Sequence, residues 1–70
     1  MGRKLSTWEA PPGRGHCEVH FDYKEEFAYI KYFDANGKQF FIEEFPNKAI
    51  GYVEDAAENW TLGIKKLTNM

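Results

Sequence analysis

The spacing of apolar residues changes abruptly after Phe45-Pro46-Asn47, and this change constrains the fold more than any other feature. Before that point, apolar and polar residues alternate, which is typical of strands with one buried face. After it, apolar residues recur every three or four positions, which indicates an amphipathic helix. A chain of 70 residues forms one domain at most. The sequence therefore predicts an α+β domain, with strands first and one C-terminal helix packed on one face of the sheet.

Three strands separated by short turns predict a three-stranded antiparallel β-meander, giving a βββα order with the helix. The expected strands cover residues 16–23, 27–33 and 39–45. Asp34-Ala35-Asn36-Gly37 is a hairpin signal, with Gly37 expected in the left-handed conformation. The register that this turn predicts pairs Tyr32 with Phe40, Lys31 with Phe41 and Ile30 with Ile42.

The first expected strand alternates strictly. One face carries Cys17, Val19, Phe21 and Tyr23, and the other carries His16, Glu18, His20 and Asp22. A register that buries the apolar face sets Glu18 opposite Lys31, which is a favourable cross-strand charge pair.

The helical pattern follows Pro46, a residue that suits a helix start. Its apolar positions are Ile50, Val53, Ala57, Trp60, Ile64 and Leu67. Gly63 either ends the helix early or, like Gly51, allows the sheet to approach closely. Lys65 and Lys66 are expected in the last turn, where they suit the helix dipole. The predicted domain spans residues 16–68.

Residues 1–15 are rich in proline and glycine and have no apolar period, so they predict an N-terminal arm or loop. Leu5 and Trp8 are its large apolar residues. They either pack against the domain, which is the favoured interpretation, or Trp8 anchors a partner.

One helix covers one face of a sheet, and the predicted second face carries a surplus of aromatic residues. The candidate binding residues are Phe27, Tyr29, Lys31, Phe33, Phe41 and Phe45, together with Trp8 from the arm. An exposed aromatic cluster of this kind usually marks an interface. Three coverings remain open: the N-terminal arm, a protein partner or second copy of the chain, and stacked nucleic-acid bases.

The segment Phe27-Ala28-Tyr29-Ile30-Lys31-Tyr32 resembles the core of the RNP1 strand of RNA recognition motifs. The resemblance covers six residues and implies that Phe27 and Tyr29 stack on single-stranded bases. The family's preceding basic residue and glycine are replaced here by Glu25-Glu26, and no helix precedes this strand. Nucleic-acid binding is therefore the second hypothesis after protein binding.

Net charge and composition limit the partners that the protein can bind and the compartments where it can occur. The net charge is −2 and the pI is about 5.6, which argues against a general binder of phosphate backbones. No apolar run approaches the ~18 residues that span a bilayer, and no apolar segment typical of a signal peptide follows the basic N-terminus. The lone Cys17 suits a reducing compartment, so we expect a cytoplasmic protein without a membrane partner.

The residues with catalytic or ligating chemistry form no recognised motif. His16 and His20 on one strand are ~13 Å apart, too far to share a metal ion directly. The expected burial of Cys17, on the face opposite the histidines, disfavours a Cys/His nucleophile pair. The sequence therefore predicts a non-enzymatic protein without metal or cofactor: a regulator, inhibitor or accessory subunit, by analogy with small phage-encoded inhibitors.

Overall fold

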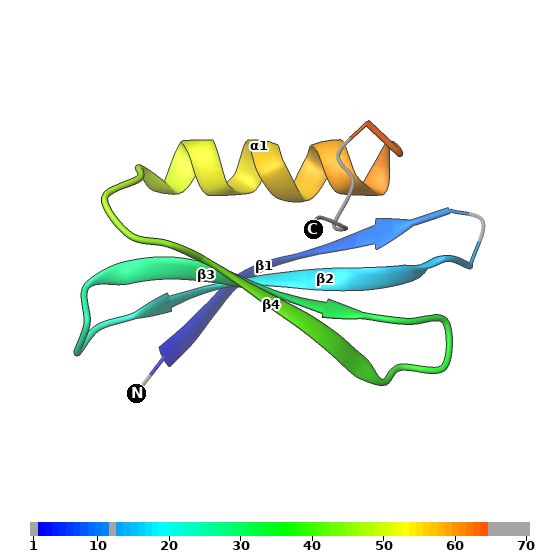
Figure 1. The fold of residues 1–70 in the computed structure, drawn as a ribbon, viewed down its shortest axis with the longest axis horizontal. Coiled ribbons are helices and arrows are strands. Elements are labelled where there is room, and N and C mark those ends of the chain that lie inside the picture. The colour runs from blue at the N-terminus through cyan, green and yellow to red at the C-terminus, as the bar shows by residue number, and fades with distance from the viewer. Residues whose placement is uncertain (1, 12, 65–70) are drawn as a thin grey trace.

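The computed structural model describes residues 2–11 and 13–64, which form one antiparallel sheet with a helix across one face (Figure 1). The strands follow in the order β1-β2-β3-β4. Their bounds are Gly2–Ala10 for β1, Gly15–Asp22 for β2, Phe27–Phe33 for β3 and Gln39–Phe45 for β4, and the helix α1 spans Ile50–Thr61. The α+β prediction is confirmed, but the sheet has four strands rather than three.

The additional strand, β1, is formed by residues expected in the N-terminal arm. It pairs with β2 from Gly2 opposite Asp22 to Ala10 opposite Gly15. Its register shifts between Lys4 and Ser6, so that one extra residue, Leu5, is accommodated as a bulge. The bulge breaks the alternation of side chains, which is why no period of two is visible in this segment.

The register of β2 on β3 agrees with the sequence. Glu18 lies opposite Lys31, and Val19 lies opposite Ile30. Tyr23 was expected on the buried face, but β2 ends at Asp22 and the Tyr23 side chain is exposed. The strand ends there because the Asp22 carboxylate accepts hydrogen bonds from the following backbone N–H groups and begins the turn.

The register of β4 on β3 differs from the prediction by one residue. Gly37 adopts the expected left-handed φ of 83°, and Phe33 pairs with Gln39 as the turn requires. A bulge then shifts the register, so that Tyr32 pairs with Phe41 and Ile30 with Glu43. A shift of one residue exchanges the two faces of a strand.

The exchange of faces overturns three placements. Phe41 and Phe45 lie on the helix side of the sheet rather than on the second face, and Ile42 lies on the second face rather than in the core. Phe45 is buried and its ring contacts Tyr52 of α1.

The helix ends where Gly63 adopts a left-handed φ of 81°. Its last turn closes with hydrogen bonds from Gly63 N–H to the Trp60 carbonyl and from Ile64 N–H to the Asn59 carbonyl. This pair of bonds is a Schellman motif, in which glycine is favoured. The early-end alternative is confirmed, whereas Lys65, Lys66 and Leu67 lie outside the described residues.

The core lies between α1 and the sheet, mainly against the first three strands, with Phe45 contributed by β4. Its members are Ala10, Cys17, Val19, Ala28, Ile30, Tyr32, Phe45, Val53, Ala56, Ala57 and Trp60. Leu5, Trp8 and Phe21 pack against its margin. Leu5 and Trp8 therefore pack against the domain, as the favoured interpretation expected, and they do so on the helix side of the sheet.

Candidate functional site

The sheet face opposite α1 is the candidate site, and we call it the open face. Alternation along the paired strands assigns to it Lys4, Thr7 and Glu9 of β1, His16, Glu18, His20 and Asp22 of β2, Phe27, Tyr29, Lys31 and Phe33 of β3, and Ile42 and Glu44 of β4. Within the described part of the chain, the helix packs on the other side (Figure 1) and no element covers the open face.

Two histidine–aromatic stacks organise the open face. The rings of His16 and Phe33 are 4.5 Å apart and 4° from parallel, and those of His20 and Tyr29 are 5.2 Å apart and 9° from parallel. Each stack joins residues directly opposite one another on β2 and β3, and the Glu18–Lys31 pair lies between them. Cross-strand contacts of this kind stabilise a sheet.

The stacks cover one side of each ring. Tyr29 and Phe33 are consequently half-buried, and Phe27, which belongs to neither stack, is half-buried as well. The most exposed large apolar side chains of the described chain, Ile64 and Leu62, follow α1, and others lie on β4, in the β2–β3 turn and on α1. Strand alternation correctly placed His16 and His20 on one face with Glu18 and Asp22, but the sequence prediction gave them no aromatic partners. The predicted pairing of Glu18 with Lys31 also sets each histidine opposite an aromatic residue, and this pairing could have predicted the stacks.

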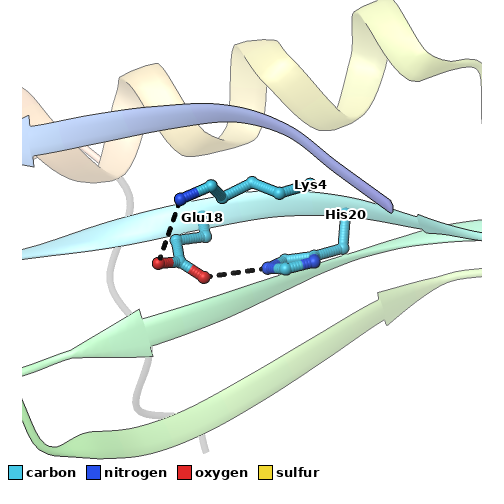
Figure 2. Close-up of polar contacts among 3 residues, drawn as sticks. All are labelled: Lys4, Glu18 and His20. Carbon is cyan, nitrogen blue, oxygen red and sulfur yellow. Dashed lines mark hydrogen bonds and ion pairs between the residues drawn. The ribbon is translucent and has the colours of Figure 1, made fainter. Parts of the chain in front are cut away.

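A charged cluster links β1 to the centre of the open face (Figure 2). One oxygen of Glu18 lies 3.8 Å from Lys4 Nζ, and the other lies 2.9 Å from His20 Nε2. Partial burial alone would raise the pKa of Glu18. The hydrogen bond with His20 and the positive charge of Lys4 outweigh that burial and lower the pKa of Glu18 below its ordinary value.

The structure brings together four of the seven predicted binding residues. Phe27, Tyr29, Lys31 and Phe33 follow one another at every second position along β3, on the open face.

The other three predicted binding residues lie on the opposite side of the sheet. Phe41 and Phe45 do so because of the β4 bulge. Trp8 packs at the margin of the core, where its indole N–H donates to Ser6 Oγ at 3.1 Å. The hypothesis that the arm covers the second face with Leu5 and Trp8 is therefore wrong.

Cys17 and the side chains of the metal-binding types are the remaining candidates for chemistry. Burial, followed by the nearby charge of Glu18, raises the pKa of the Cys17 thiol to about 12, so the thiolate required of a nucleophile does not form near neutral pH. Among residues 2–11 and 13–64, no group of three or more histidine, cysteine or acidic side chains is placed to hold a metal ion.

A shallow pocket lies beside the helix. Tyr52, Ala56, Asn59 and Ile64 line it, and its volume is about 240 Å³. These side chains include no carboxylate, imidazole or thiol, and Tyr52 is the only one of them with a group used in acid–base or nucleophilic chemistry.

Comparisons with known proteins add no assignment to this geometry. No protein family, curated protein or solved structure matches the chain. None of the helices in the described residues has the length and apolarity needed to cross a membrane.

Proposed function

We propose that this chain is a small non-enzymatic protein-binding module, acting in the cytoplasm as a regulator, inhibitor or accessory subunit, and that the open face is its binding surface. The observation that carries the proposal is the row Phe27, Tyr29 and Phe33 on the sheet face that α1 leaves uncovered. Aromatic side chains are enriched in protein interfaces, where they bury large areas at a low cost in side-chain entropy.

The stacks support recognition by a rigid surface. His16 packs against one side of the Phe33 ring and His20 packs against one side of the Tyr29 ring, so both rings are ordered before a partner binds. Groups that are ordered before binding lose less entropy on association. The open face is therefore a preorganised surface.

The charges of the open face favour a protein over a nucleic acid. Two lysines, Lys4 and Lys31, stand among four carboxylates, those of Glu9, Glu18, Asp22 and Glu44. A phosphate backbone is bound by an excess of positive charge, which this face lacks.

Single-stranded nucleic-acid binding is the alternative. It is supported by one observation: Phe27 and Tyr29, the residues that the RNP1 resemblance assigns to base stacking, occupy the same face of β3. Lys31 is next on that face and is the nearest candidate for a phosphate contact.

Site-specific photo-crosslinking tests the proposal. A photoreactive side chain replaces Phe27 in one sample and Leu62, an exposed residue at the C-terminal end of α1, in a matched control. In lysate of the source cells, we expect the open-face probe to capture a protein that the helix-end probe does not. Calorimetry with that purified protein should then show binding weakened about tenfold or more by Tyr29→Ala, with little effect of Leu62→Ala.

The alternative is tested in parallel by fluorescence anisotropy with single-stranded RNA and DNA oligonucleotides at low salt. Salt-dependent binding lost in Tyr29→Ala would replace the proposal with the nucleic-acid function. Equal capture by both probes, or a captured protein that is insensitive to Tyr29→Ala, would overturn the assignment of the open face.

A further inference from the structure

Within the described residues, β1 and β4 form the two edges of the sheet, and they differ in their protection against pairing. Both edge strands carry one bulge, so the difference in protection comes from their side chains. Along β1, the charged residues Arg3, Lys4 and Glu9 are spread over the strand, and charges on an edge discourage another strand from pairing with it. The first half of β4 is uncharged, and its residues 40–42 are Phe-Phe-Ile.

These three exposed side chains are divided between the two faces of the sheet. Phe40, Phe41 and Ile42 are 51%, 38% and 44% exposed. The bulge brings both Phe40 and Phe41 beside the Tyr32 ring, on the helix side, whereas Ile42 lies on the open face. The helix packs mainly on β1, β2 and β3, and of the β4 apolar side chains it covers Phe45 but leaves Phe40, Phe41 and Ile42 exposed. A strand added beside β4 would cover apolar groups on both faces.

The apolar area at this edge is substantial. Tyr52 of α1, which is 55% exposed, extends the patch through its contact with Phe45. The exposed fractions of Tyr52 and the three β4 residues correspond to roughly 400 Å² of side-chain surface, if each residue offers about 200 Å². A stable interface buries about 800 Å² per partner. The patch thus supplies about half of that area, and the strand backbone and flanking side chains contribute the remainder.

The charges flanking this edge are self-complementary. Lys38 precedes β4, and Glu43 and Glu44 lie toward its C-terminal end. Two copies of β4 that pair antiparallel around Phe41 or Ile42 bring Lys38 of each copy opposite Glu44 of the other, or within two residues of it. Parallel pairing would instead place like charges together, which is unfavourable.

We propose that a second copy of this chain pairs with β4, edge to edge and antiparallel, to form a continuous sheet across a two-fold axis. Such an axis is perpendicular to the sheet, so both helices lie on the same side and the two open faces form one surface. The inference goes beyond the proposed function, because it concerns the β4 edge rather than the binding of another protein to the open face.

Light scattering across a concentration series tests the pairing. We expect the mass of the intact chain to rise from 8.2 kDa toward twice that value. Phe40→Lys places a charge at the edge and should weaken dimerisation about tenfold or more. Leu62→Lys is the matched control, since Leu62 is also exposed but follows the other end of α1, beside the β1–β2 turn. Circular dichroism of both variants at low concentration checks that the fold is retained.

A charge reversal separates this arrangement from nonspecific association. Lys38→Glu and Glu44→Lys should each weaken dimerisation by about 2- to 30-fold, because the symmetry counts each pair twice, and the double variant should recover most of the loss. A monomer up to about 1 mM would overturn the proposal and leave the edge for an extended segment of another protein. Dimers that are insensitive to Phe40→Lys, or single reversals without rescue, would overturn the β4 interface. Phe40 lies off the open face, whereas Glu44 lies on it, so the outcome of Phe40→Lys is the one that is separate from the crosslinking experiment.

Discussion

Replacing Tyr32 with phenylalanine is expected to destabilise the protein through the loss of one buried hydrogen bond. The Tyr32 side chain is fully buried, its ring packs on Trp60, and its hydroxyl donates to Glu43 Oε1 at 3.0 Å. Burial, reinforced by the adjacent Glu43 carboxylate, raises the pKa of the Tyr32 hydroxyl far above its ordinary value, so it remains a donor across the accessible pH range.

The magnitude follows from the charge and exposure of the two partners. Hydrogen bonds to charged groups contribute about 1.5–3 kcal/mol. Glu43 is half-buried and recovers some hydration when the hydroxyl is removed, so we expect the free energy of unfolding to fall by about 1–2 kcal/mol. In a domain of this size, that loss lowers the Tm by roughly 5–15 °C.

Urea denaturation of a double-mutant cycle provides the measurement. Tyr32→Phe, Glu43→Ala and the double variant are compared with the parent, because the cycle subtracts the contacts that each residue makes elsewhere. Tyr52→Phe is the control, since Tyr52 is largely exposed, and should change the stability by less than about 0.5 kcal/mol.

The same cycle tests the bulged register. Without the bulge, Glu43 would lie on the face opposite the Tyr32 side chain and the two could not meet. A coupling energy within about 0.3 kcal/mol of zero would therefore refute both the hydrogen bond and the register assigned to β4.

Three further predictions concern an acidic residue of the open face, a glycine at the start of β2 and an arginine in the β1–β2 turn. Because the pKa of Glu18 is lowered in the folded state, its ionised form stabilises the protein above the pKa of the unfolded chain, and this contribution is lost as the pH falls through the folded pKa. Glu18→Gln should thus lower stability by about 0.5–1 kcal/mol near pH 7, and the difference from the parent should vanish in acid; a difference independent of pH would contradict the role of the charge. Gly15→Ala should lower the free energy of unfolding, measured by urea denaturation, by at least about 2 kcal/mol. The residue has a φ of 118°, and an added Cβ would collide with the Phe33 carbonyl oxygen. Gly13→Ala is the control and should lower it less, because an added Cβ there meets open space. Arg14→Gln should lower the Tm by a few degrees, because Arg14 Nη2 donates to the last carbonyl of α1 at 2.7 Å, and an unchanged Tm would exclude this helix-capping role.

Much of the fold was predictable because local patterns and local turns determine it. Strict alternation between positions 16 and 22 places Cys17 and Val19 in the core, and the helical period places Val53 and Trp60 against them. The alternation in β2 and β3 also sets Glu18 opposite Lys31. The left-handed conformations of Gly37 and Gly63 follow from the steric freedom of glycine. These features depend on a few neighbouring residues, so the sequence alone determines them.

The tertiary structure decided the features that depend on bulges and on contacts distant in sequence. The bulge at Leu5 lets β1 join the sheet although its residues show no regular alternation. The bulge in β4 exchanges its faces, so that Phe45 packs under α1 and Glu43 meets the Tyr32 hydroxyl.

The candidate site also has one part that local patterns determine and another that depends on the tertiary structure. Alternation within β3 placed Phe27, Tyr29, Lys31 and Phe33 on one face, whereas the membership of Phe41 and Phe45 depended on the β4 register. A bulge adds one residue at little local cost, and it is retained when the packing of the whole strand improves. A run such as Phe40-Phe41-Ile42 has no alternation that selects a face, so the helix and the neighbouring strand select it.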